Sequence, residues 1–196
     1  MNIRKLKTFI TKKLRLELSK DLTYHGLHHT LDVLNVCNDY IKRLKLNPHE
    51  AYLLRTAALL HDVGILWKYV GHEAAGVSYS HNLLPDYGYS QEDIKKIEGM
   101  IMATKIPQKP HTILERIICD ADLDYLGRAD FYPIGNTLYK EFMAYKVVQN
   151  EFEWDELQIK FLTDHYYHTN FAKKYREPKK VYYLKELKIK LNKDIS

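Results

Sequence analysis

Three short groups of His and Asp residues are the strongest candidates for chemistry in this chain. They are the segment 24–29 (Tyr-His-Gly-Leu-His-His), the His61-Asp62 doublet inside AALLHDVGI, and Asp120 and Asp122 inside IICDADLDYL. Imidazole nitrogens and carboxylate oxygens are the donors that first-row divalent metals favour, and a catalytic site leaves positions open for water or substrate. We therefore predict one buried site, assembled from three helices, that binds a divalent metal.

The surroundings of the His61-Asp62 doublet favour burial. Four apolar residues (57–60) precede the doublet and Val63 follows it. The doublet could simply end a helix before Gly64, but a buried polar pair must be satisfied by some partner. A metal would satisfy both side chains at once.

The acidic segment has apolar residues on both sides. We therefore expect Asp120, Asp122 and Asp124 to lie in a mostly buried helix start, where three carboxylates would repel one another unless a cation or a helix N-terminus compensated them. An acidic N-cap with solvated neighbours would explain one or two of these residues, but not all three.

The elements that must position these groups are predicted to be helices, because apolar residues recur at steps of three and four. Asn47-Pro48 and the Thr112–Glu115 spacing mark helix starts. We predict an all-α fold, a single compact multi-helix bundle over residues 1–196 with the site core at about 20–130 and the helices of 131–196 packed on it. The expected helices are 3–19, 27–45, 48–67, 72–84, 91–104, 112–127, 131–149, 154–174 and 178–192.

Length and composition suit a soluble globular protein. The 196 residues are 45% hydrophobic and 28% charged, which is enough apolar sequence for one full core. The longest apolar stretch is far shorter than the ~20 residues that span a bilayer, so we expect no membrane partner. The N-terminus mixes apolar residues with Lys and Arg and does not resemble a secretory leader, so a cytoplasmic location is expected. Cys37 and Cys119 stand in helical apolar contexts that favour buried free thiols.

The net charge of +5 favours anionic partners such as phosphorylated metabolites, nucleotides or RNA. The C-terminal segment HYYHTNFAKKYREPKKVYY interleaves Tyr with Lys and Arg, a composition that could stack bases and hold phosphates. The simpler interpretation, which we favour, is that Tyr166, Phe171, Tyr175 and Tyr183 pack these helices onto the core.

The candidate ligands follow one another along the chain as a His, then a His-Asp doublet, then a distant Asp. This order resembles the pattern of the HD-domain metal-dependent phosphohydrolases, a helical superfamily. The segment YHGLHHTLDVL is also similar to the Tyr-His-Asn-x-x-His segment of cyclic-nucleotide phosphodiesterases. The resemblance covers about residues 20–130 and implies that His29, His61 and Asp62 are metal ligands. It implies a general acid at His25. For the last ligand it favours Asp122, with Asp120 as the alternative.

Two-metal members of this superfamily carry further histidines between the doublet and the last Asp. In this chain only His72 matches such a position, as a second-metal or phosphate contact, so we expect one tightly bound metal. Glu73 beside it could orient water. Lys105 and Arg128 are candidates for anion clamps, although a surface charge is the plainer interpretation of each.

These residues predict a metal-dependent phosphohydrolase, a phosphomonoesterase or phosphodiesterase that cleaves a nucleotide or related small phosphorylated compound with metal-activated water. The donor set suits Mn, Fe, Co or Zn, or Mg, and does not distinguish among them. Two alternatives stay open. One is a metal-binding HD sensor or binding module without turnover, and the other is an RNA-binding or RNA-processing protein.

Overall fold

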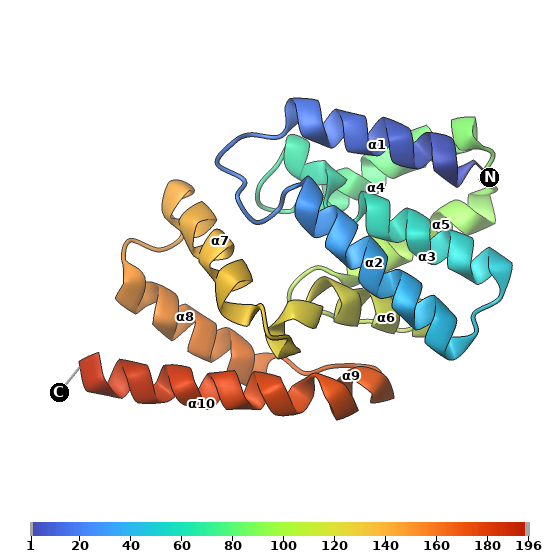
Figure 1. Ribbon diagram of the computed structural model, residues 1–196. Coiled ribbons are helices and arrows are strands. Elements are labelled where there is room, and N and C mark those ends of the chain that lie inside the picture. Colours follow the sequence, from blue (N-terminus) through green and yellow to red (C-terminus); the bar gives the residue numbers. More distant parts are fainter. Residues whose placement is uncertain (1, 195–196) are drawn as a thin grey trace. The chain divides into compact units, whose positions relative to one another are not determined.

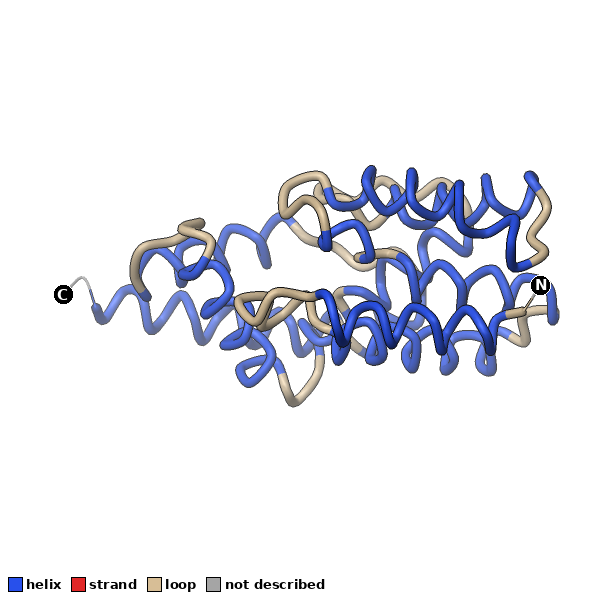
Figure 2. Tube along the Cα trace, turned by 90° about the horizontal axis from the view of Figure 1, so that it is seen from above, coloured by secondary structure: helices blue, strands red, loops and turns tan. Residues whose placement is uncertain are grey.

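The computed structural model describes residues 2–194, and within that range it contains helices and loops but no strand (Figures 1 and 2). This confirms the all-α fold class. None of these helices is long and apolar enough to cross a membrane. The α-helices are α1 (Ile3–Glu17), α2 (Leu27–Leu44), α3 (Pro48–Leu60), α4 (His72–Leu83), α5 (Gln91–Ala103), α6 (Ile113–Asp122), α7 (Phe131–Ala144), α8 (Glu151–Asp164), α9 (Asn170–Tyr175) and α10 (Glu177–Asp194). Short 3-10 helices are η1 (Val63–Leu66), η2 (Leu84–Tyr87) and η3 (Asp124–Gly127).

The chain forms two compact units. The first comprises Met1–Lys20 and His25–Asp122, and the second comprises Asp21–Tyr24 and Leu123–Ser196. Whether the two make one domain, as the sequence suggests, stays a prediction.

In the first unit α3 is the central element. It packs against α1, α2, α5 and α6, and it buries Leu53, Leu54, Ala57 and Ala58 almost completely. A helix that is apolar on nearly every side has to be surrounded by others. The residues that follow its last turn are therefore delivered into the interior.

The predicted helix starts are confirmed. The Asn47 side chain accepts from the backbone N–H of Glu50 while the Glu50 carboxylate accepts from the N–H of Asn47, a complete capping box. Thr112 and Glu115 make the same reciprocal pair ahead of α6. Both cysteines are free and buried, as expected.

Helix ends differ more from the predictions. The helices expected over 48–67, 112–127 and 131–149 end earlier, at Leu60, Asp122 and Ala144. Hence the acidic segment lies at the C-terminal end of α6, and our placement of it at a helix start was wrong. Contacts with other parts of the chain decide where a helix ends, and the local periodicity of apolar residues does not contain that information.

The helix expected over 154–174 is two helices, α8 and α9. His165 turns into extended backbone, and Thr169 caps α9 by accepting from the N–H of Ala172. Between them Tyr167 is fully buried and its hydroxyl donates to the backbone oxygen of Leu123 at 3.1 Å. The chain leaves the helical conformation between α8 and α9 so that the Tyr167 side chain can enter the core.

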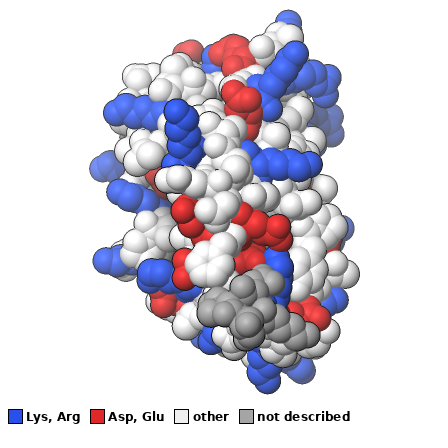
Figure 3. All heavy atoms as spheres, turned by 90° about the vertical axis from the view of Figure 1, so that its left-hand side faces the viewer, with Lys and Arg blue, Asp and Glu red and all other residues white. Residues whose placement is uncertain are grey.

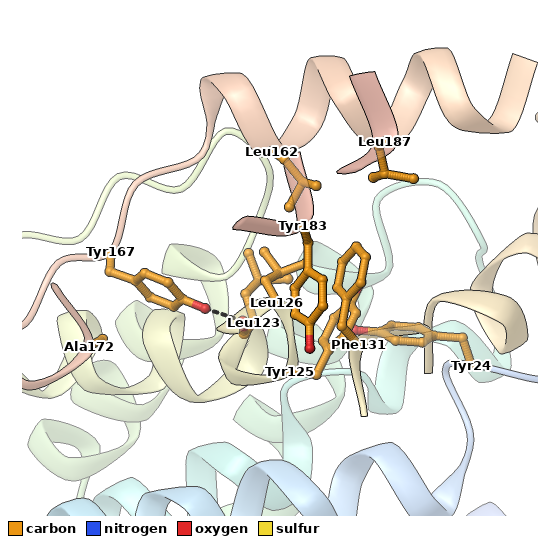
Figure 4. Close-up of a cluster of buried hydrophobic side chains, with 10 residues drawn as sticks. All are labelled: Tyr24, Leu123, Tyr125, Leu126, Phe131, Leu162, Tyr167, Ala172, Tyr183 and Leu187. Atoms are coloured by element: carbon orange, nitrogen blue, oxygen red, sulfur yellow. Dashed lines mark hydrogen bonds between the residues drawn. The ribbon is translucent and has the colours of Figure 1, made fainter. Parts of the chain in front are cut away.

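The core of the second unit is aromatic (Figure 4). The rings of Phe131 and Tyr183 stack with centroids 4.4 Å apart. The predicted packing is thus confirmed for Tyr183. It is wrong for Tyr166 and Tyr175, which are 64% and 55% exposed, because the break between α8 and α9 changes which side faces the core.

Candidate metal centre

Three helices of the first unit bring the His and Asp residues together. His29 lies in the first turn of α2, His61 caps the C-terminus of α3, and Asp122 is the last residue of α6. Asp62 follows His61 and precedes η1. Because α2 packs against both α3 and α6, residues separated by more than ninety positions become neighbours.

The donor atoms are spaced as metal ligands are. His29 Nε2 lies 3.0 Å from Asp122 Oδ1 and 3.3 Å from His61 Nε2, and His61 Nε2 lies 3.5 Å from Asp122 Oδ1. Ligands about 2.1 Å from a metal stand roughly 3.0 to 3.4 Å from one another in octahedral or tetrahedral geometry. Among the residues that the structure describes, His29, His61 and Asp122 form the one such group of His, Cys, Asp and Glu.

Asp62 adds a buried carboxylate whose charge needs compensation. Its Oδ2 atom lies 3.0 Å from His61 Nε2 and 3.4 Å from His29 Nε2, and it has no hydrogen-bond partner within residues 2–194. A buried carboxylate oxygen is unfavourable unless a proton on a neighbouring ring or a cation compensates it. A cation among these atoms would provide that compensation, so the residues present fit a divalent metal.

The orientation of His61 supports this interpretation. Its Nδ1 donates a hydrogen bond to the backbone oxygen of Ala58 at 2.9 Å. In the neutral ring the Nε2 lone pair therefore points at the carboxylates, where only a proton or a metal makes the contact favourable. Without a metal, burial disfavours the charged ring, but the Asp62 and Asp122 carboxylates together outweigh burial and raise the pKa of His61 well above its usual value.

The two carboxyl groups respond in the opposite direction. Burial opposes their ionisation, but the His61 ring holds the pKa of Asp62 well below its usual range. For Asp122 the His29 and His61 rings together outweigh burial and lower the pKa to about 2. Both groups are therefore carboxylates at neutral pH, as metal ligation requires.

A second group of side chains borders the other oxygen of Asp62. His72 Nε2 lies 3.3 Å from Asp62 Oδ1 and 3.7 Å from Glu73 Oε1, while His72 Nδ1 donates to the backbone oxygen of Tyr69 at 2.9 Å. Burial opposes charging of His72, but the Asp62 carboxylate, the Tyr69 backbone oxygen and Glu73 together outweigh burial and raise the pKa of His72 to about 9. The ring of His25 lies beside it, with centroids 5.5 Å apart.

The remaining predicted site residues are not members of this donor group. Asp120 is fully buried in α6 but lies outside the group of three donors. The side chain of Lys105 is exposed, just beyond α5. Arg128 belongs to the second unit, where its guanidinium donates to both carboxylate oxygens of Asp130 at 2.9 and 2.8 Å. Their functional roles stay predictions.

One residue that matters for the site was not singled out from the sequence. A Cβ at Gly64 would overlap the backbone oxygen of His72 and the backbone nitrogen of Gly76, so η1 and α4 touch through bare backbone. The signal was available, since an isolated Gly in an apolar run marks a close approach of two chain segments.

Comparisons with known proteins found a family model and a solved structure that are similar to this chain. The model of the HD-CE family matches residues 17–104. The crystal structure of a predicted HD superfamily hydrolase from an uncultured Thermotogales bacterium superposes with a TM-score of 0.62 at 20% identity, covering 98% of this chain and 99% of that one. No curated protein matches the sequence significantly. The structural match shows that this chain has the same all-α fold, and the matched segment holds His29, His61 and Asp62.

We expect Gly64→Ala to destabilise the fold by roughly 1–3 kcal/mol, because the new methyl group overlaps backbone that has to move. Gly76→Ala is the matched control. Its Cβ would meet its nearest neighbours at 3.5 Å, an ordinary contact, so stability should be unchanged or slightly higher. Urea unfolding measures both variants. Equal stability of the two would show that η1 and α4 do not pack as described.

Proposed function

We propose that this chain is a metal-dependent hydrolase of the HD superfamily that cleaves a phosphate ester of a nucleotide or another small phosphorylated compound. One observation carries the proposal. It is the convergence of the buried His29 and His61 with the partly buried Asp122, beside the buried Oδ2 atom of Asp62. The shared fold and the HD-CE match over residues 17–104 support it.

The metal would be held by His29, His61, Asp62 and Asp122. Two imidazoles and two carboxylates suit Mn²⁺, Fe²⁺, Co²⁺ or Zn²⁺, and Mg²⁺ is the weaker candidate because it prefers oxygen donors. When bound, such an ion lowers the pKa of a coordinated water from 15.7 toward about 7 and neutralises phosphate oxygens.

The neighbouring side chains supply proton transfer and charge. Asp62 contacts His72, which in turn lies beside Glu73, and we propose these two carboxylates as acceptors for the proton of the attacking water. His72 contacts both of them and would hold an anionic phosphoryl group. His25 is only partly buried, so it can face both the site and an entering substrate and protonate the leaving oxygen.

The proposal is tested by metal analysis of the purified protein, followed by phosphate release from nucleoside mono-, di-, tri- and cyclic phosphates with each divalent metal. We expect stoichiometric metal and release from at least one compound, abolished by chelation and restored by metal. Bound metal without turnover of any phosphate ester would overturn the hydrolase and leave a metal-binding module.

We expect His61→Ala and Asp122→Asn to lose bound metal and activity together. Removing a ligand should weaken metal binding by more than the ~100-fold that loss of an outer-shell partner costs. Asp120→Asn is the matched control, because it alters a buried carboxyl of the same helix outside the donor group. Elemental analysis of variants shown to be folded by circular dichroism decides. Stoichiometric metal in Asp122→Asn with loss in Asp120→Asn would reverse the two assignments.

We expect His25→Ala to retain the metal and lose about 10²–10⁴ in kcat, the usual contribution of a general acid. The loss should be much smaller for a nitrophenyl phosphate, because nitrophenolate leaves without a proton. Comparing kcat for the two kinds of substrate tests the role. An equal loss with both would show that His25 positions the substrate and does not protonate the leaving group.

A further inference from the structure

The second unit contains a cavity that takes no part in the proposed function. It has a volume of about 530 Å³ and lies between α7, α8 and α10. That volume is within the range of small-molecule sites. The aromatic core described above ends beside it, at Leu187 of α10.

Aromatic rings form one wall of the cavity. Tyr132 and Tyr139 come from α7 and Trp154 from α8, and the rings of Tyr139 and Trp154 lie with centroids 5.8 Å apart. Trp154 is also held edge-on by Phe142 at 5.7 Å. The face of an aromatic ring carries the negative side of its quadrupole and attracts cations.

Carboxylates form the other wall, and they outnumber the cations. The Lys190 ammonium bridges Glu151 at 2.6 Å and the buried Asp155 at 2.7 Å. Glu186 is the third carboxylate, and among the described side chains (residues 2–192) it has no ion-pair partner. Its oxygens accept from the hydroxyls of Tyr132 at 2.9 Å and Tyr182 at 2.7 Å. The cavity lining is therefore two negative charges in excess. Asp and Glu also gather near the middle of the face drawn in Figure 3, with Lys and Arg mostly toward its edges.

We propose that this cavity binds a small organic amine in its ammonium form, held by Glu186 and by the faces of Tyr132, Tyr139 and Trp154. Ring faces and one uncompensated carboxylate are the combination that recognises organic ammonium groups. A hard divalent ion is disfavoured, because it requires several oxygens converging at about 2.0–2.6 Å, whereas Glu151 and Asp155 already share Lys190. Anions are disfavoured by the charge of the lining.

Lys190 indicates that an ammonium is stable at this place. Burial disfavours its charged form, but Asp155 and Glu151 outweigh burial and raise the pKa of Lys190 above its usual value. The same lining would act on an amine beside Glu186. A diamine or polyamine suits the elongated charge distribution, with one ammonium at Glu186 and the rest of the chain along the rings.

Spermidine and 1,5-diaminopentane are suitable probes. In a Trp67→Phe background Trp154 is the one remaining tryptophan, so its fluorescence reports occupancy. We expect saturable binding with Kd below about 1 mM. Glu186→Gln should weaken it at least tenfold, because the amide still accepts from the tyrosines but lacks the charge. Glu156→Gln on the exposed side of α8 is the matched control and should bind as the parent does.

A second variant should change the affinity for amines in the opposite direction. Lys190→Met removes the built-in ammonium and leaves Glu151 and Asp155 uncompensated, so amine binding should strengthen at least tenfold. His61→Ala should bind amines normally, which separates this proposal from the metal centre. Absence of saturable binding to either amine, or equal affinity of the parent, Glu186→Gln and Lys190→Met proteins, would overturn the proposal.

Discussion

The contact between the His61 Nε2 lone pair and the Asp62 and Asp122 carboxylates is the interaction on which the candidate site depends. Acceptor faces acceptor across 3.0 and 3.5 Å in a buried environment. Such a contact is unfavourable unless a proton or a metal ion lies between the atoms. The backbone oxygen of Ala58 fixes the ring so that this lone pair cannot turn away.

The rest of the first unit serves to hold that contact in place. α3 is apolar on nearly all sides, so it is enclosed by other helices and carries His61 into the interior. α2 lies across α3 and α6 and adds His29. The bare backbone of Gly64 lets α4 approach, which brings His72 to the second oxygen of Asp62. Each of these helices contributes to the site through a residue at or near one of its ends.

Local patterns predicted the fold class, the helix starts and the burial of the His61-Asp62 doublet, because capping boxes and apolar periodicity are encoded by neighbouring residues. They did not choose between Asp120 and Asp122. At ~100° per residue these two side chains point to opposite sides of α6, and which side faces His29 depends on packing against α2. For the same reason the break at Tyr167 and the exposure of Tyr166 were not predictable. They follow from a hydrogen bond to Leu123, forty-four positions away.

Three buried carboxylates, those of Asp62, Asp124 and Asp155, differ in the groups that compensate their charge, and the difference bears on what each can do. In the second unit Asp124 pairs with Arg176 at 2.7 Å and Asp155 with Lys190 at 2.7 Å, both cations that stay charged at all physiological pH values. Among the described side chains, the ion-pair partners of Asp62 are imidazoles alone. An imidazole can exchange its proton for a metal ion, which then takes the nitrogen lone pair, and a guanidinium or a paired ammonium cannot do this. A carboxylate compensated in this way is suited to exchange a proton for a metal ion, whereas those compensated by Arg and Lys are suited to stay as they are.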